Sequence, residues 1–118
     1  METNWPDKNW IEIGDIHDIP VRGARCVKTP HGRIAVFRTA EDHVYAMEDR
    51  CPHKGGPLSQ GIVHGTSVTC PLHNMVISLE TGRALGADEG EVRSVAVRNR
   101  DGMLSIALDS LMLMVAAE

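Results

Sequence analysis

Residues 51–73 read CPHKGGPLSQGIVHGTSVTCPLH and contain two short motifs, each of which pairs a cysteine with a histidine. The motifs are Cys51-Pro52-His53 and Cys70-Pro71-Leu72-His73, and sixteen residues separate them. Neighbouring residues of a straight strand point to opposite faces, so ligands this close together require irregular turns, which proline and glycine favour. Thiolate and imidazole groups are donors for transition metals. The pattern predicts a metal centre bound by Cys51, His53, Cys70 and His73.

Two kinds of metal centre fit this donor set. It resembles that of a Rieske [2Fe–2S] cluster, in which two cysteines bind one iron and two histidines the other. A structural zinc ion also accepts two cysteines and two histidines. Zinc fingers usually group cysteine with cysteine and histidine with histidine, whereas both motifs here are mixed, which favours the iron–sulfur interpretation. A nucleophilic Cys51 or Cys70 with a histidine base is a weaker alternative, because it leaves the second motif unexplained.

Composition limits the other possibilities. The chain has 118 residues, of which 42% are hydrophobic, so it is long enough for one packed domain over residues 1–118. Its net charge of −4 argues against nonspecific nucleic-acid binding, which needs a basic face. We find no apolar stretch typical of a secretory signal or of a membrane span. Three cysteines without a signal fit a reducing compartment, so we expect a cytoplasmic protein with no membrane association.

Short runs rich in β-branched residues alternate with turn signals along most of the chain, which predicts an all-β fold, a small antiparallel sandwich or barrel. Strands are expected over residues 10–13, 21–29, 33–39, 43–47, 61–63, 66–69, 75–79, 91–98 and 103–108, with a turn or a single helical turn over 16–20. Residues 49–75 hold both motifs and are expected to form a small cluster-binding subdomain of two loops. The apolar tail, residues 109–118, is expected to pack on its own domain or to contact a partner, with a possible short helix over 111–115.

Most of the remaining candidate residues have structural explanations. Cys26 lies in an apolar run and is expected to be a small buried residue. The histidines outside the motifs are expected on the solvated surface: His17, His31, His43 and His64. The acidic residues Asp88, Glu89 and Glu91 are expected in a solvated loop, or at a docking edge if that loop lies near the cluster. Glycines 55, 56 and 61 are expected to let backbone N–H groups approach the cluster sulfides.

The segments CPHKGGPL (51–58) and CPLH (70–73) closely resemble the pattern of Rieske-type ferredoxins. More narrowly, residues 51–65, 70–74, 79–82 and 86–90 resemble the small subunit of assimilatory NAD(P)H-dependent nitrite reductase. This resemblance implies a Rieske fold and a large catalytic partner that carries FAD, a [4Fe–4S] cluster and sirohaem and reduces nitrite to ammonia. The small subunit would transfer electrons or help to assemble the complex, and would not bind nitrite itself. The resemblance also implies that Cys51 and Cys70 bind the iron that stays ferric, and His53 and His73 the iron that is reduced.

Two departures from related patterns sharpen these expectations. Dioxygenase ferredoxins usually have Gly-Trp after the last ligand histidine, whereas this chain has Asn74-Met75, which weakens the dioxygenase interpretation. Asn74 favours the nitrite reductase resemblance, while Met75 replaces an aromatic residue that is expected in both families. Many nitrite reductase small subunits lack the ligands, but this chain retains all four, so we expect a cluster. A stand-alone ferredoxin for a mono- or dioxygenase and a cluster-free assembly module remain as alternatives.

High-potential Rieske proteins add two cysteines that bridge the loops and hydroxyl groups near the second motif. The corresponding positions here are Gly56 and Leu72 for the cysteines, and Met75 and Ile77 for the hydroxyls. Fewer hydrogen bonds to sulfur stabilise the reduced, more negative cluster less. We therefore expect a potential in the lower half of the Rieske range, which runs from about −150 to about +300 mV.

Overall fold

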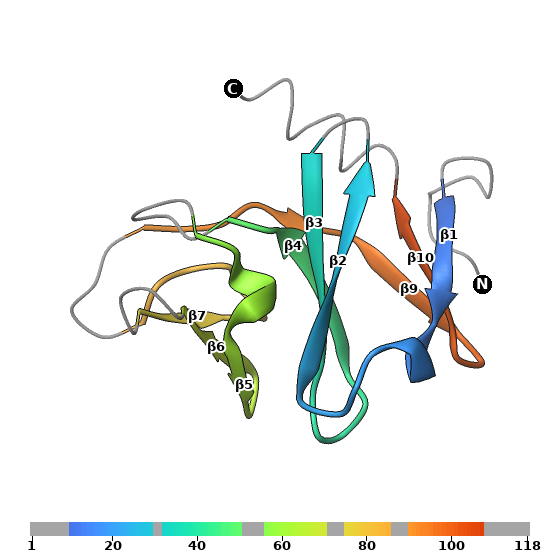
Figure 1. The fold of residues 1–118 in the computed structure, drawn as a ribbon, viewed down its shortest axis with the longest axis horizontal. Coiled ribbons are helices and arrows are strands. Elements are labelled where there is room, and N and C mark those ends of the chain that lie inside the picture. Colours follow the sequence, from blue (N-terminus) through green and yellow to red (C-terminus); the bar gives the residue numbers. More distant parts are fainter. Residues whose placement is uncertain (1–9, 30–31, 51–55, 71–74, 86–89, 108–118) are drawn as a thin grey trace.

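The computed structural model describes residues 10–29, 32–50, 56–70, 75–85 and 90–107. These residues form three antiparallel sheets and two short 3₁₀ turns (Figure 1), so the predicted all-β antiparallel fold is confirmed. In the described parts of the chain, no helix reaches the length and hydropathy needed to cross a bilayer. The C-terminal tail, residues 109–118, lies outside the described residues.

The middle layer is a four-stranded sheet in the order β2-β3-β4-β8. Its strands are β2 (Gly23–Thr29), β3 (Gly32–Arg38), β4 (Val44–Glu48) and β8 (Ser94–Val95). The hairpin expected between residues 21–29 and 33–39 is present as β2 and β3, which pair from Gly23 with Arg38 to Thr29 with Gly32.

A three-stranded sheet lies on each side of this layer (Figure 1). One contains β1 (Trp10–Asp15), β10 (Met103–Ala107) and β9 (Val97–Arg100), in that order. The other contains β5 (Ile62–His64), β6 (Ser67–Thr69) and β7 (Val76–Ser78). The two 3₁₀ turns are η2 (Ile16–Asp18), which follows β1, and η3 (Leu58–Gln60), which precedes β5.

Strand β3 is buried on both faces because it lies between two separate cores. Ile34 and Val36 point to the core shared with the β1-β10-β9 sheet, while Ala35 and Phe37 point to the core shared with the β5-β6-β7 sheet. Successive side chains of a strand alternate between faces, so one strand can supply both cores. This explains why residues 34–37 form an unbroken apolar run rather than an alternating one.

The turn η2 confirms the helical turn expected after the first strand. The carboxylate of Asp15 accepts a hydrogen bond from the backbone N–H of His17 at 2.8 Å. This bond is the main reason why the pKa of Asp15 lies below its usual value. The buried guanidinium of Arg38 donates to the carbonyl oxygen of Ile19 at 2.8 Å and so ties the end of this turn to β3.

The prediction of a single strand over residues 91–98 is wrong, because this segment is divided between two sheets. Val95 pairs with Ala46 in the middle sheet, whereas Val97 pairs with Ile106 in the β1-β10-β9 sheet. The break falls at Ala96, whose carbonyl oxygen accepts from the N–H of Ala107 at 3.0 Å. The chain changes sheet here, so a continuous strand is not compatible with the topology.

The expected burial of Cys26 is also wrong, since this residue is exposed. It lies on β2, opposite Ala35, and β2 is the edge strand of the middle sheet. The apolar sequence around a residue does not show which strand will lie at an edge, and an edge strand has a neighbour on one side alone.

Candidate metal centre

In the sequence, the two motifs lie in two segments that flank strands of the β5-β6-β7 sheet. The first ligand segment, residues 50–57, connects β4 to η3 and contains Cys51 and His53. The second ligand segment, residues 71–74, connects β6 to β7 and contains His73. Cys51, His53 and His73 lie outside the described residues, so of the four predicted ligands the structure describes Cys70.

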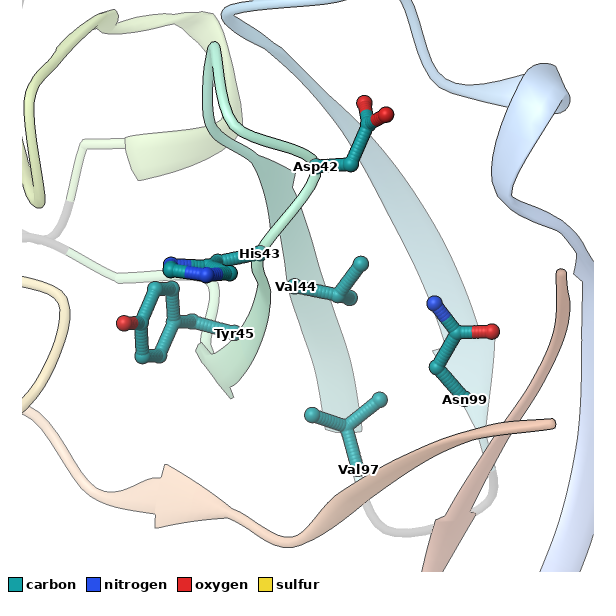
Figure 2. Close-up of a pocket in the computed structure, with 6 residues that line it drawn as sticks. All are labelled: Asp42, His43, Val44, Tyr45, Val97 and Asn99. Carbon is teal, nitrogen blue, oxygen red and sulfur yellow. The ribbon is translucent and has the colours of Figure 1, made fainter. Parts of the chain in front are cut away.

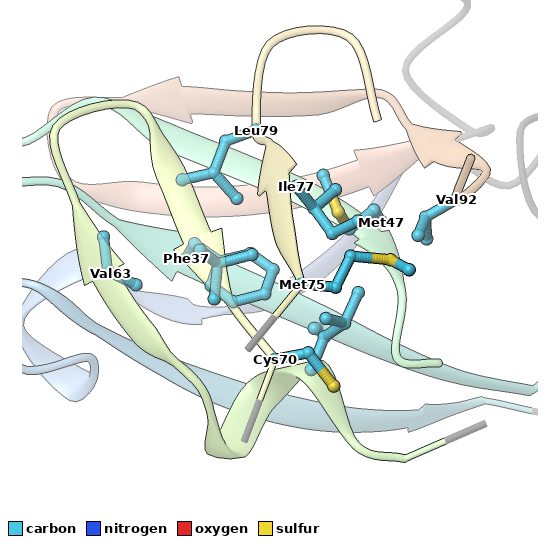
Figure 3. Close-up of a cluster of buried hydrophobic side chains, with 11 residues drawn as sticks. Phe37, Met47, Val63, Cys70, Met75, Ile77, Leu79 and Val92 are labelled. Atoms are coloured by element: carbon cyan, nitrogen blue, oxygen red, sulfur yellow. The ribbon is translucent and has the colours of Figure 1, made fainter. Parts of the chain in front are cut away.

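Cys70 is fully buried and belongs to the core between the middle sheet and the β5-β6-β7 sheet. Figure 3 shows its side chain at the rim of this core, with the sulfur on the side away from Phe37 and Met75 in this view. The N–H of Cys70 donates to the carbonyl oxygen of Met75 at 2.7 Å. Since Thr69 pairs with Val76 in the β6–β7 ladder, this bond extends the ladder by one step to the ends of the second ligand segment.

The ends of the first ligand segment meet through a side chain. The N–H of Asp49 donates to the carbonyl oxygen of Arg33 at 2.9 Å, which fixes Asp49 to the middle sheet. Its carboxylate accepts hydrogen bonds from the N–H of Ser59 at 2.8 Å and from the Ser59 hydroxyl at 2.7 Å. Residues on either side of Cys51 and His53 are therefore held together by one buried carboxylate, which is 5% exposed.

Cys26 lies close to the same carboxylate, although it comes from the edge strand β2. Partial desolvation, and then the hydrogen bond and negative charge of Asp49, raise the pKa of the Cys26 thiol, and the positive charges of Arg33 and Lys28 oppose this shift. The thiol is therefore protonated at neutral pH. The thiolate is the form that binds metal ions, so Cys26 is a poor candidate for a further ligand.

Gly61 has a packing role in the structure, and its expected role near the cluster sulfides stays a prediction. A Cβ atom at Gly61 would collide with the carbonyl oxygen of Thr69 and with the Val68 side chain. The end of η3 therefore lies directly on β6, next to Cys70. Close approach of two backbones is a common reason for glycine in such a position.

Met75 and Ile77 are both buried, with exposed fractions of 2% and 0%. At these positions the high-potential proteins have hydroxyl groups, whereas here the side chains pack in the core with Phe37 and Met47 (Figure 3). Neither side chain can donate a hydrogen bond to a sulfide. The low-potential expectation remains a prediction, and this packing supports it.

A surface pocket of about 440 Å³ lies at the beginning of β4, at the opposite end of that strand from Asp49 (Figure 2). It is lined by Asp42, His43, Val44, Tyr45, Val97 and Asn99. Among the described residues, no group of three histidine, cysteine or acidic side chains is arranged to hold a metal ion, here or elsewhere. None of the residues that line this pocket is a predicted ligand of the metal centre.

The other sequence-based expectations for surface residues agree with the structure where it describes them. His17, His43 and His64 are exposed, and His31 lies outside the described residues. Glu91 is exposed and forms an ion pair with Arg83 at 3.5 Å, whereas Asp88 and Glu89 are not described.

Asp49 and Ser59 are functional residues that the sequence patterns do not predict. Aspartate and serine are common in solvated turns, and no spacing rule marks a pair that is ten residues apart. The one feature of the sequence that could have pointed to this pair is its position, since Asp49 and Ser59 lie on either side of the first motif.

The chain matches the model of the Rieske-like [2Fe-2S] domain over residues 9–107. It belongs to the Rieske family. A curated relative, the ferredoxin component of the naphthalene 1,2-dioxygenase/salicylate 5-hydroxylase systems of a Ralstonia species, is 33% identical over 78 residues, which cover 66% of this chain and 74% of the relative. This match and the family model confirm the recognition as a Rieske protein and the [2Fe–2S] cofactor prediction.

Two solved structures show the same Rieske fold. The ferredoxin of carbazole 1,9a-dioxygenase from Nocardioides aromaticivorans IC177 aligns with a TM-score of 0.76 at 20% identity, covering 84% of this chain and 97% of that chain. A protein from Mycobacterium tuberculosis described as an NADH-dependent nitrite reductase small subunit aligns with a TM-score of 0.75 at 22% identity, covering 83% and 93%. At such identities the similarity concerns the fold, and the two scores do not separate the two functions.

The residues of this Rieske protein fit the cofactor of its family. Two thiolates and two imidazoles are the donor set of a Rieske cluster. The one donor that the structure describes, Cys70, is buried at the end of a hairpin, where water is excluded and where the second motif continues. A Rieske [2Fe–2S] protein transfers single electrons, and this is the activity that the family supports for the chain.

Proposed function

We propose that this chain is the electron-transfer subunit of a cytoplasmic assimilatory NAD(P)H-dependent nitrite reductase. In this proposal residues 1–118 form one Rieske domain, and residues 49–75 bind the cluster. The partner is a large catalytic subunit with FAD, a [4Fe–4S] cluster and sirohaem, which reduces nitrite to ammonia. The observation that carries the choice is the sequence around the second motif and the GADEG run at 86–90, which resemble those of nitrite reductase small subunits.

Each ligand has a distinct role in this proposal. When bound, the [2Fe–2S] cluster accepts and donates one electron at a time. Cys51 and Cys70 hold the iron that stays ferric, and the burial of Cys70 suits that role. His53 and His73 would hold the iron that changes its oxidation state, through which electrons would enter and leave. Neutral imidazoles in place of thiolates reduce the negative charge and make the cluster easier to reduce.

A stand-alone ferredoxin that supplies a mono- or dioxygenase is the second candidate function. The observation that favours it is the 33% identity to the Ralstonia ferredoxin component over two thirds of the chain. The cluster and its ligands would be the same in both cases. The catalytic partner therefore distinguishes the two candidates.

Deletion of the gene in the source organism tests the proposal directly. We expect loss of growth with nitrite as the sole nitrogen source and normal growth with ammonium. The wild-type gene and a Cys26→Ser gene should restore growth on nitrite, because Cys26 is an exposed cysteine outside the donor set. A Cys70→Ser gene should not restore it.

Normal growth of the deletion strain on nitrite would refute the nitrite reductase role. Loss of growth on an aromatic carbon source instead would support the second candidate. An affinity-tagged chain should also purify with a large protein that shows sirohaem absorbance, and purification with an oxygenase would contradict the proposal. Iron and acid-labile sulfide assays, with about two of each per chain expected, separate an electron carrier from a cluster-free assembly module.

A further inference from the structure

We propose that Asp49 is a positioning residue for the metal centre: its carboxylate closes the first ligand segment by binding Ser59 and so holds Cys51 and His53 in place. This inference rests on the ligand assignment made under the proposed function. Asp49 does not touch the cluster in this proposal and acts through the segment that it closes.

The two residues joined by this contact lie at the two exits of the first ligand segment. Asp49 directly precedes the segment and is attached to β3 through its N–H, which donates to the carbonyl oxygen of Arg33 at 2.9 Å. Ser59 follows the segment and lies in η3, which packs through Leu58 into the core. A hydrogen-bonded bridge between them fixes the distance that the first ligand segment has to span.

The turn η3 depends on this distant carboxylate for a cap. Its N-cap residue, Pro57, makes no side-chain hydrogen bond to the turn. The N–H of Ser59 donates instead to Asp49, ten positions earlier in the chain, at 2.8 Å. An acidic oxygen that accepts from such an N–H orients the turn, and a charge-assisted bond is stronger than a neutral one.

Burial makes the contact specific. Asp49 is 5% exposed, and a buried carboxylate needs hydrogen-bond donors to offset its desolvation. Ser59 supplies two donors, its backbone N–H and its hydroxyl. Loss of the Ser59 hydroxyl would remove one of these bonds, whereas loss of the carboxylate would leave both donors without this acceptor.

No strand pairing can replace this contact. The first ligand segment leaves β4 in the middle sheet and enters η3 and β5, which belong to a different layer (Figure 1). β4 and β5 are in different sheets and share no backbone ladder, and the side chain of Asp49 joins the two ends of the segment by binding Ser59. Partners that lie beyond the ligands and orient them typically contribute about 10- to 100-fold to metal affinity.

The test compares the rate at which purified, cluster-loaded variants lose iron to a chelator, followed by visible absorbance. We expect Asp49→Ala to lose iron about 10- to 100-fold faster than the wild type. Ser59→Ala loses the hydroxyl bond but keeps the bond from the backbone N–H of residue 59, so it should lose iron about 3- to 10-fold faster than the wild type. Asp49→Asn retains an amide oxygen that can accept from the Ser59 N–H, so it should lie closest to the wild type.

Asp15→Ala is the matched control, because Asp15 also accepts from the N–H of a 3₁₀ turn, at 2.8 Å, but belongs to β1 of the β1-β10-β9 sheet. Its iron loss should equal that of the wild type. Two further readouts separate positioning from general stability. Asp49→Ala should shift the EPR line positions and the midpoint potential, while its far-UV circular dichroism keeps the β-sheet signal.

Iron loss from Asp49→Ala that is no faster than from Asp15→Ala would overturn the inference. If Asp49→Ala fails to fold, Ser59→Ala decides, and unchanged iron loss and EPR lines in that variant would refute the role. If the wild type holds no iron after anaerobic purification and reconstitution, the ligand assignment itself fails. If the wild type holds iron and the Asp49 variants hold it equally firmly, the positioning role alone fails.

Discussion

The two ligand segments are closed in different ways. The ends of the second segment are joined by backbone, through the N–H of Cys70 and the carbonyl oxygen of Met75, as a continuation of the β6–β7 ladder. The ends of the first are joined by the side chains of Asp49 and Ser59. A backbone closure tolerates most substitutions because every residue except proline supplies the same groups. A side-chain closure depends on two particular residues, so we expect the first segment to be the more sensitive part of the centre.

Removal of one histidine ligand should have the greatest effect. Making this change in each segment in turn tests whether both segments bind the same cluster. His53→Ala and His73→Ala should each abolish the Rieske EPR signal, since each removes a donor to the same iron. The far-UV circular dichroism should keep the β-sheet signal. His64→Ala is the control, because His64 is exposed and its Nε2 contacts the Thr69 hydroxyl at 2.6 Å. An unchanged EPR spectrum in either ligand variant would refute that ligand assignment.

A smaller effect is expected at Gly61, at the end of η3, which packs against β6. Gly61→Ala would push a Cβ atom against the carbonyl oxygen of Thr69, and overpacking of this kind usually costs about 1–3 kcal/mol. Thermal unfolding measures this loss of stability, and iron loss should accelerate with it.

Gly65→Ala is the matched variant in the same β5–β6 hairpin. Gly65 has a φ of +58°, and nothing lies within 4 Å of a Cβ atom there. Its cost is therefore conformational, about 1–2 kcal/mol, and it should not affect iron loss. Equal iron loss from the two glycine variants would contradict a specific contact between η3 and β6.

The midpoint potential of the cluster tests whether the buried Met75 and Ile77, which follow the second segment, affect its reduction. Because Met75 and Ile77 cannot donate hydrogen bonds to sulfur, we expect a midpoint in the lower half of the Rieske range. Protein-film voltammetry measures it. A midpoint above about +100 mV would contradict this expectation.

The weakest effect is expected at Cys26, a residue outside the donor set whose thiol is influenced by Asp49. Desolvation and the Asp49 carboxylate raise its thiol pKa above the ordinary value of 9.0. The protonated thiol is thus favoured in the folded state, so its small contribution to stability is present below pH 9.0 and disappears as the pH rises through the raised pKa. Alkylation of Cys26 by iodoacetamide should be slow at neutral pH and faster in Asp49→Asn, in which the negative charge is removed. Equal rates would show that Asp49 has no influence on this thiol.

Local chemistry allowed much of the fold and the donor set to be predicted. The hairpins of β2 with β3 and of β5 with β6 follow from strand-forming residues on either side of glycine-containing turns, and the spacing of the two motifs indicated the Rieske family. These features depend on residues that are close together in the chain, so pattern rules apply to them.

The remaining features depended on which strands became neighbours. Residues 91–98 are divided because two sheets compete for them, and Cys26 is exposed because β2 lies at an edge. Local residue patterns are sufficient to predict most of the strands and turns and the family to which the four donors point. The contact between Asp49 and Ser59 depends instead on the packing of the layers, which brings two residues ten positions apart within hydrogen-bond distance.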